Sequence, residues 1–289
     1  MVGGITNKTT GDGFISHNVC QYWEEGRKCW ELLTELPQSN YRVFDACQVA
    51  SDQLLLTGGT VSFVAQSSCW LLHTATKKWT NLAPLNTARR YHRSVFLEGQ
   101  VYVVGGWDVN NKVTGSVERF DLKRRQWSCL SDLPHPVYAP AATSHGHRVY
   151  VFGGLDADNK VLSCTQAYDS ATGQWLTLAA TPKVCNLGAA VSLGSYVYLV
   201  GGSYRSCLRY APAEDRWREL SRPHLEHANA PAVVWQGGVL VSGDGGGDDK
   251  RSAAIETYDP VRDEWSDWPT PLKVPLDSHR TFSVVISDV

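Results

Sequence analysis

Cysteine and histidine are the residues of this chain best suited to hold a metal ion or to act as nucleophiles. Its 289 residues include 8 cysteines and 9 histidines. The cysteines are spread along the chain without a CxxC pair and without a Cys/His pair at zinc-ligand spacing. We therefore interpret them as free thiols of a reducing compartment, and we expect no metal site.

Cys185 is the cysteine with two interpretations. We expect it in a loop near Lys183, where a neighbouring cation can lower the pKa of a thiol. A redox-sensitive thiol and an inert thiol both fit this position. Four other cysteines fall in predicted strands, where small apolar residues belong to the core; these are Cys20, Cys69, Cys164 and Cys207.

Other catalytic arrangements lack essential parts. The sialidase Asp box, Ser-x-Asp-x-Gly-x-Thr-Trp, is absent. A copper-radical site of the galactose oxidase type needs tyrosine, cysteine and histidine together, but the closest histidines, His145 and His147, fall at a predicted turn. The glycine-rich stretch 245–250 has neither the Gly-Lys-Ser/Thr of a P-loop nor a Rossmann context. We expect a non-enzymatic protein without a cofactor, and an enzyme or metalloprotein remains a remote alternative.

Composition and charge argue against nucleic-acid and membrane ligands. The net charge is −2, so the chain lacks the basic excess that phosphate backbones or anionic lipids attract. No run of 18 apolar residues occurs, and the N-terminus does not resemble a signal peptide. We expect a cytoplasmic protein, with cytoskeletal and nuclear locations as alternatives.

The strongest signal is a repeat. Tryptophans stand at 30, 79, 127, 175, 217 and 265, and double glycines precede most of them at 3–4, 58–59, 105–106, 153–154 and 201–202. The sixth copy has Ser242-Gly243 in this place. A period of 42 to 49 residues indicates a repeat architecture.

Each copy predicts four strands, which we name a to d. Strand a is an alternating apolar stretch, as in Ser94 to Leu97, and strand b is β-rich, as in Gln100 to Val104 and Arg148 to Phe152. After the glycines and a polar loop, strand c ends in an aromatic seven residues before the tryptophan of strand d; these aromatics are Phe120, Tyr168, Tyr210 and Tyr258. We expect the tryptophans and these aromatics to form the core between sheets.

These features resemble the Kelch repeat, whose mark is a double glycine followed by a spaced Tyr and Trp at a period near 50. The resemblance covers essentially the whole chain. It implies an all-β fold, a six-bladed β-propeller in which each four-stranded blade stacks on its neighbours. We expect residues 1–289 to form one such domain.

The two ends of the chain predict how the ring closes. Gly3-Gly4 belongs to a strand b without a preceding strand a, whereas Thr281 to Ile286 looks like a strand a without a following strand b. We expect residues 281–289 to pair with the N-terminal strand and to complete the blade of residues 1–30, which removes two exposed edges. The sequence then begins in the middle of a blade, so we expect it to be a piece of a longer protein.

Alternating strand directions place the loops on two faces of the ring. The b–c and d–a loops emerge on one face, which we call the loop face, and the tight a–b and c–d turns emerge on the other, the turn face. The loop face has the longer and more varied segments. Loops on a rigid scaffold commonly carry function, so we expect the partner site there.

The chain resembles the Kelch domains of BTB-Kelch adaptors, in which a BTB domain binds cullin-3 and the propeller captures the ubiquitylation substrate. In that family the substrate contacts the start of strand a, about 15 positions before the second glycine. The family's frequent arginine is missing from this position in every copy. Neighbouring residues give the predicted partner site, which consists of Tyr41, Arg42, Phe44, Arg90, Tyr91, Arg93, Trp107, Tyr138, Asn186, Tyr204, Asn229, His279 and Arg280.

The resemblance leaves two binding functions open. The leading hypothesis is the substrate-recognition domain of a cullin-3 ubiquitin ligase adaptor, which reaches cullin-3 through an upstream BTB domain outside this chain. The alternative is an actin- or cytoskeleton-binding Kelch scaffold. Arginines at the predicted site favour a short protein segment with carboxylate or phosphate groups, and aspartates on the same face favour a segment of mixed charge.

Overall fold

The computed structural model describes residues 2–7, 19–24, 27–38, 41–243, 254–272 and 277–283. Over these ranges the chain forms strands and turns without a helix. None of the described segments is therefore a helix that could cross a membrane.

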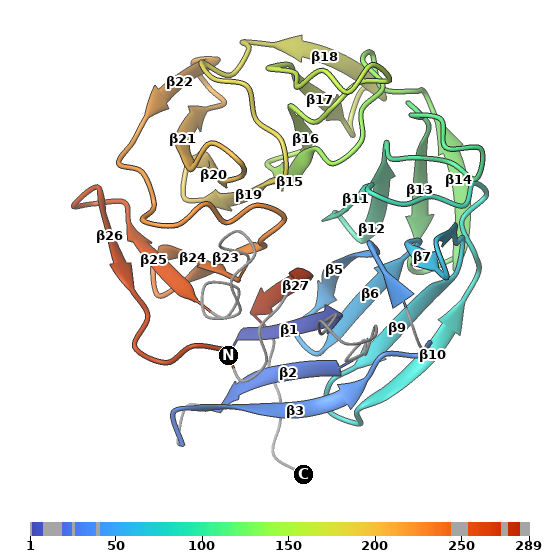
Figure 1. Ribbon diagram of the computed structural model, residues 1–289. Coiled ribbons are helices and arrows are strands. Elements are labelled where there is room, and N and C mark those ends of the chain that lie inside the picture. The colour runs from blue at the N-terminus through green and yellow to red at the C-terminus, as the bar shows by residue number, and fades with distance from the viewer. Residues whose placement is uncertain are drawn as a thin grey trace.

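Six four-stranded antiparallel sheets form the blades of a ring, which confirms the predicted six-bladed propeller (Figure 1). The blades, each given from strand a to strand d, begin with β27 (Asp277–Ser283), β1 (Val2–Asn7), β2 (Val19–Glu24) and β3 (Cys29–Glu35). Blade 2 comprises β5 (Asp45–Ala50), β6 (Gln53–Thr57), β9 (Cys69–His73) and β10 (Lys78–Leu82). Blade 3 comprises β11 (Arg93–Leu97), β12 (Gln100–Val104), β13 (Val117–Asp121) and β14 (Gln126–Leu130).

The other three blades follow the same order. Blade 4 comprises β15 (Ala141–His145), β16 (Arg148–Phe152), β17 (Thr165–Asp169) and β18 (Gln174–Leu178). Blade 5 comprises β19 (Gly188–Leu193), β20 (Tyr196–Gly201), β21 (Ser206–Ala211) and β22 (Arg216–Glu219). Blade 6 comprises β23 (Ala232–Trp235), β24 (Gly238–Ser242), β25 (Ile255–Asp259) and β26 (Glu264–Asp267). A small extra sheet joins β4 (Tyr41–Arg42), β7 (Thr60–Val61) and β8 (Val64–Ala65).

Burial explains the strand order within a blade. Strand a lines the centre of the ring, and strand d lies at the perimeter (Figure 1). Strand b is an inner strand of its blade, and neighbouring blades cover both of its faces. Four of its five residues are therefore buried in β12 and in β16. A strand that is covered on both faces reads as a nearly continuous apolar run, and this is why the sequence predicted the bounds of these two strands correctly.

The first blade combines the two ends of the described chain. β27 lies antiparallel beside β1, with Gly4 opposite Thr281 and Gly3 opposite Phe282. The strand begins at Asp277, four residues before the predicted start at Thr281. Its first four residues are polar, so the apolar pattern did not reveal them. Residues 284–289 lie outside the described part of the chain.

The repeated tryptophans connect neighbouring blades. Five indole Nε1 groups donate a hydrogen bond of 2.7 to 2.9 Å to a backbone carbonyl at or just after the end of strand d of the preceding blade; the pairs are Trp79 with Glu35, Trp127 with Ala83, Trp175 with Ser131, Trp217 with Ala179 and Trp265 with Ser221. The prediction that these tryptophans form the core between blades is corrected in part. Trp265 is buried, but the other four are half-buried at the edge of the core clusters, because the indole must reach a carbonyl near the perimeter.

The double glycine is required by the close approach of two blades. In blade 4, Gly154 N donates to the carbonyl of Cys185, which lies in the loop that enters blade 5 (2.9 Å). A Cβ atom on Gly153 would lie only 2.1 Å from the same carbonyl oxygen. A side chain at Gly153 would therefore force the two blades apart.

Alanine at Gly153 tests this contact. We expect Gly153→Ala to lower the free energy of unfolding by about 3 to 4 kcal/mol, because a left-handed backbone strain is added to a backbone clash. Gly146→Ala is the matched control, since Gly146 has a φ of 56° against 55° at Gly153 but no atom within 4 Å of its Cβ position. It should cost only the strain of about 1 to 2 kcal/mol. Equal losses in urea titrations would contradict the clash.

Candidate functional site

Two neighbouring blades build the same small module on the loop face. In blade 3, the d–a loop residue Arg90 pairs with Trp107 of the b–c hairpin through two backbone hydrogen bonds of 2.8 and 3.0 Å. In blade 4, Tyr138 pairs in the same way with Leu155, with two bonds of 2.9 Å. The sheet of β4, β7 and β8 has this geometry in blade 2. The loop face is therefore held by backbone pairing.

The hairpins of blades 3 and 4 share one internal design. Asp108 Oδ1 accepts from the backbone N–H groups of Asn110 and Lys112 at 2.8 and 2.9 Å. Asp156 caps its own hairpin in the same way at 2.9 Å. Their carboxylates are hydrogen-bonded inside the hairpins, so they give less support to a mixed-charge ligand than the sequence indicated.

Three aromatic rings meet where these two modules touch. The ring centroids of Trp107 and Tyr138 lie 4.8 Å apart, and Tyr91 lies 5.9 Å from Trp107 and 6.1 Å from Tyr138 with its ring edge-on. The guanidinium carbon of Arg90 lies 4.9 Å from the Trp107 ring centroid, a cation–π distance. We call Arg90, Tyr91, Trp107 and Tyr138 the aromatic cluster.

Polar contacts fix the outer side of the aromatic cluster. Arg90 Nη2 donates to Asn111 Oδ1 at 2.7 Å, and the Tyr138 hydroxyl donates to Asn159 Oδ1 at 2.6 Å. The two asparagines occupy the same hairpin position in successive blades. Burial raises the pKa of Tyr138, and nearby Tyr91 and Asp156 raise it further. The phenol therefore remains a hydrogen-bond donor at neutral pH.

Exposed apolar side chains lie at the tips of three b–c loops on the same face. Phe63 in blade 2 is 76% exposed, Val109 in blade 3 is 58% exposed, and Tyr204 in blade 5 is 51% exposed. Sequence reasoning predicted Tyr204 but missed Phe63, Val64 and Val109. Val109 is an apolar residue in a polar loop and Phe63 and Val64 lie in a loop of mixed composition, so the signal is visible in the sequence but not distinctive.

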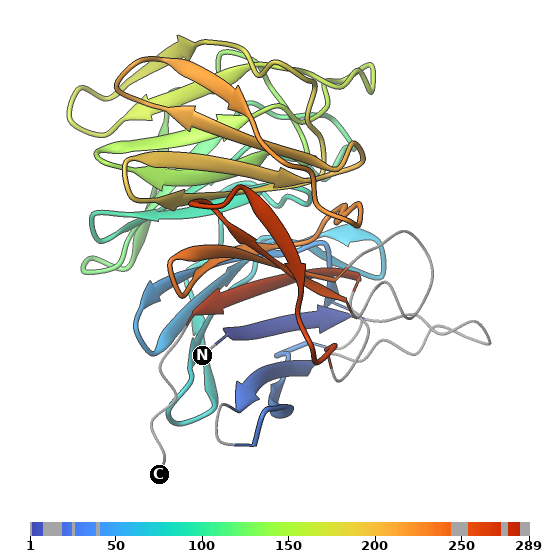
Figure 2. The ribbon, with the colours of Figure 1, turned by 90° about the vertical axis from the view of Figure 1, so that its left-hand side faces the viewer.

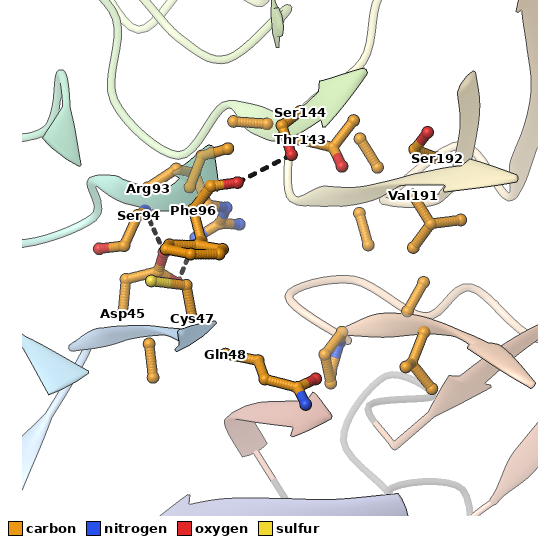
Figure 3. A pocket seen from close by; sticks show the side chains of 18 of the residues that line it. Asp45, Cys47, Gln48, Arg93, Ser94, Phe96, Thr143, Ser144, Val191 and Ser192 are labelled. Atoms are coloured by element: carbon orange, nitrogen blue, oxygen red, sulfur yellow. Dashed lines mark hydrogen bonds and ion pairs between the residues drawn. The ribbon is translucent and has the colours of Figure 1, made fainter. Parts of the chain in front are cut away.

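A central channel opens beside the aromatic cluster. Its cavity of about 430 Å³ is lined by β5, β11, β15, β19 and β23, the innermost strands of five blades. Figure 3 shows its polar groups, which include Asp45, Gln48, Ser144 and Ser192. Six of the lining residues are alanine.

Two predicted site residues belong to the core. Tyr41 is completely buried, and its hydroxyl donates to the carbonyl of Gly58; burial raises its pKa. Phe44 is buried beside it, with ring centroids 5.3 Å apart. Both pack in one core cluster with Leu54 and Leu56. The prediction that they contact a partner is wrong, because spacing located the loop but not the inward direction of these side chains.

The remaining predicted residues are spread around the ring. Arg93 lines the channel, where its Nη1 lies 3.9 Å from Asp45 Oδ1 (Figure 3), whereas Arg90 is not among the residues that line it. Arg42, Asn186 and Asn229 are half-buried in other d–a loops. His279 and Arg280 lie in β27 instead of a loop, and their side chains are outside the described part of the structure.

A histidine shared by two carboxylates lies at blade 6. His224 Nδ1 is 3.0 Å from Glu256 Oε1 and 3.1 Å from Asp267 Oδ1. These are hydrogen-bond distances, and Glu256 also accepts from the backbone N–H groups of His224 and Leu225. We describe this group as a hydrogen-bonded network.

Cys185 is an inert thiol by its surroundings. It is buried, and burial raises its pKa to about 12. The cation that lowers this pKa is Arg93, whereas Lys183 forms an ion pair with Glu219. The expected influence of Lys183 is therefore not found, and the redox-sensitive interpretation loses its basis.

Comparison with known proteins identifies the repeat. Residues 43–227 and 91–289 match the family described as the KLHDC2/KLHL20/DRC7 Kelch-repeats domain. The chain belongs to this Kelch-repeat family. The Kelch domain is also similar in fold to the protein in "Structure of YjhT", with a TM-score of 0.69 and 17% identity over 82% of this chain and 86% of that one.

Curated relatives match parts of the domain. Alpha-scruin of Limulus polyphemus is 25% identical over 151 residues, which cover 50% of this chain and 16% of that protein. Kelch-like protein 35 of Mus musculus is 27% identical over 141 residues, with coverage of 49% and 23%. Kelch-like protein 6 of Homo sapiens is 33% identical over 100 residues, with coverage of 35% and 16%. The matched segments thus span less than a quarter of these relatives.

Alkylation of the native domain tests the state of Cys185. At pH 8 the thiol should remain protonated and covered, because its pKa is raised to about 12, and the thiolate is the reactive form. We expect mass spectrometry after brief iodoacetamide treatment to find Cys129, which is exposed, labelled and Cys185 unlabelled. Denaturation before treatment should label both. Rapid native labelling of Cys185 would contradict its assignment as inert.

Proposed function

We propose that this Kelch domain is the substrate-recognition domain of a BTB-Kelch adaptor of a cullin-3 ubiquitin ligase, and that it binds a segment of the substrate protein on the loop face. The observation that carries the binding role is the gathering of the aromatic cluster and the exposed tips Phe63, Val109 and Tyr204 on that face. Matches to Kelch-like proteins 35 and 6 support the adaptor assignment.

The physical properties of this surface favour a protein ligand. Clustered exposed apolar groups that are bordered by polar groups are typical of interaction sites. Aromatic and arginine side chains supply most of the energy at such sites, since they combine a large contact area with directed hydrogen bonds. Backbone pairing holds Arg90 and Tyr138 in place before binding, which lowers the entropy lost on association.

The proposed role is non-catalytic. The domain holds a substrate, and the transfer chemistry belongs to the ligase with which the adaptor assembles. In this proposal cullin-3 is reached through a BTB domain of the longer protein, and the complex acts in the cytoplasm.

Substitution of the exposed tips tests the binding face. We expect the triple variant Phe63→Ser, Val109→Ser, Tyr204→Ser to lose partner binding at least tenfold, because it removes apolar contact area from the loop face. Its unfolding free energy should change by under about 1 kcal/mol, since exposed substitutions are individually small. The matched control is Val261→Ser, which changes an apolar residue that is 92% exposed in a c–d turn on the turn face.

The adaptor role has its own readout. In cells, the whole protein should co-precipitate cullin-3, and a substrate held by the wild-type domain should lose ubiquitin-dependent turnover in the triple variant but not in Val261→Ser. Binding of purified domain to filamentous actin, with no cullin-3 in the precipitate, would instead favour the cytoskeletal scaffold. Loss of the partner in Val261→Ser alone would show that the wrong face was chosen.

A further inference from the structure

His227 is a completely buried histidine at the junction of blades 5 and 6. Its backbone carbonyl accepts the N–H of Gly202 from blade 5 at 3.1 Å. Its ring contacts blade 6 on both sides, with Nδ1 2.8 Å from the carbonyl oxygen of Gly243 and Nε2 2.6 Å from Glu256 Oε2. One residue therefore joins two blades and the d–a loop that carries Asn229.

The same junction occurs 138 residues earlier with an arginine. The backbone carbonyl of Arg89 accepts the N–H of Gly59 at 2.8 Å. Its guanidinium donates to the carbonyl of Gly105 at 3.0 Å and to Glu118 Oε1 at 2.7 Å. Glu118 accepts hydrogen bonds from two backbone N–H groups of the d–a loop that carries Arg89. Glu256 likewise accepts from two backbone N–H groups of the loop that carries His227. The glycine amide, the glycine carbonyl and the buried glutamate at Arg89 thus have counterparts around His227, whereas the further bonds of Arg89 to Ser116 do not.

The hydrogen bonds of His227 define its protonation. The Gly243 carbonyl can only accept, so Nδ1 must carry a proton. Burial raises the pKa of Glu256, but hydrogen bonds from His227 and from the backbone of His224 and Leu225 outweigh it and hold this pKa below the usual value. The carboxylate is therefore ionised and also only accepts, so Nε2 must carry a proton too. A neutral imidazole has one N–H, and this geometry requires the imidazolium.

Charged groups from neighbouring elements surround this pair. Behind the Glu256 carboxylate lie the exposed His224 and, on β26, Asp267. From the b–c turn of blade 5, Arg205 donates to the carbonyl of Pro223 in the same d–a loop at 2.6 and 3.0 Å. His224 is a second histidine beside Glu256, so any test must separate its effect from that of His227.

We propose that His227 makes the junction of blades 5 and 6 dependent on protonation, whereas Arg89 keeps the junction of blades 2 and 3 independent of it. Histidines change charge between about pH 5 and 8, and a guanidinium keeps its charge over this range. As the pH rises, the imidazole loses one proton, and either Gly243 or the buried Glu256 loses its donor. The stabilising contacts are present on the acidic side of this range and are lost above it.

The opposite sign applies to Glu256. Because the pKa of Glu256 lies below the usual value, its carboxylate stays ionised to a lower pH than the carboxylate of an ordinary glutamate. The hydrogen bonds between His227 and blade 6 are therefore complete while the imidazolium and the carboxylate are both charged, and they weaken when the imidazolium loses a proton at higher pH. Their weakening releases the d–a loop of blade 6, independently of whether the loop face binds a partner.

Hydrogen exchange at the glycine amides tests the proposal. In the wild-type domain, exchange protection of Gly202 N–H, corrected for the intrinsic rate, should fall about tenfold between pH 6.0 and 8.5, because the imidazole can no longer donate to both of its acceptors. Gly106 N–H, which donates to the Val137 carbonyl, is the internal reference and should change less than twofold. His227→Arg, which places the arginine of the blade 2–3 junction here, should make exchange of the Gly202 amide equally insensitive to pH.

Two further variants separate the alternatives. Arg89→His should transfer the pH dependence to the Gly59 amide, and His224→Gln should leave the dependence at Gly202 intact. Loss of the dependence in His224→Gln, or its persistence in His227→Arg, would overturn the proposal. If His227→Arg does not fold, nitrogen NMR of the wild-type ring decides: both ring nitrogens of His227 should be protonated at pH 6.5, and a neutral tautomer there would overturn it.

Discussion

In four d–a loops of the described chain, one backbone carbonyl holds two blades together. The second glycine of the preceding blade donates its N–H to this carbonyl at 2.8 to 3.1 Å. The first glycine lies so close that a Cβ atom would come within 2.1 to 2.7 Å of the same oxygen. This contact occurs at the carbonyls of Arg89, Val137, Cys185 and His227. The double glycine thus sets where each loop enters the next blade, and the position of the loop face follows from it.

Backbone hydrogen bonds also link these d–a loops to one another. The N–H of Ala139 donates to Tyr91 at 2.7 Å, that of Leu187 to Ala139 at 3.4 Å, and that of Asn229 to Leu187 at 2.7 Å. These four residues have left-handed backbones with φ between 48° and 58°. Such backbones cost energy for residues other than glycine and persist where the surroundings fix them. These d–a loops are therefore held by a series of backbone hydrogen bonds, which fixes the position of Tyr91 beside Trp107.

Sequence reasoning succeeded where backbone periodicity decides the structure. The strand bounds Gln100–Val104 and Arg148–Phe152 were predicted correctly because both strands are buried on two faces. Spacing also located the d–a loops, so Tyr91 and Tyr138 were found. It could not give side-chain direction. The Tyr41 side chain points into the core, where its hydroxyl donates to the carbonyl of Gly58, while Tyr138 at a similar loop position belongs to the aromatic cluster. The exposed tips were missed, because an apolar residue in a loop gains its meaning only from neighbours in other blades.

The side chains at the junction position show that the repeats share a backbone but not a chemistry. Arg89 and His227 reach buried glutamates, whereas Val137 and Cys185 pack among apolar residues, Cys185 in one cluster with Leu208. The carbonyl contact alone accepts any of these side chains. A buried charge without its partner is costly, however, so the polar junctions require a particular charge state and the apolar ones do not. Blades 3 and 6 lie on opposite sides of the ring (Figures 1 and 2). Since each blade interacts mainly with its neighbours, a change of charge at one polar junction is felt there first, and the other three junctions continue to hold the ring.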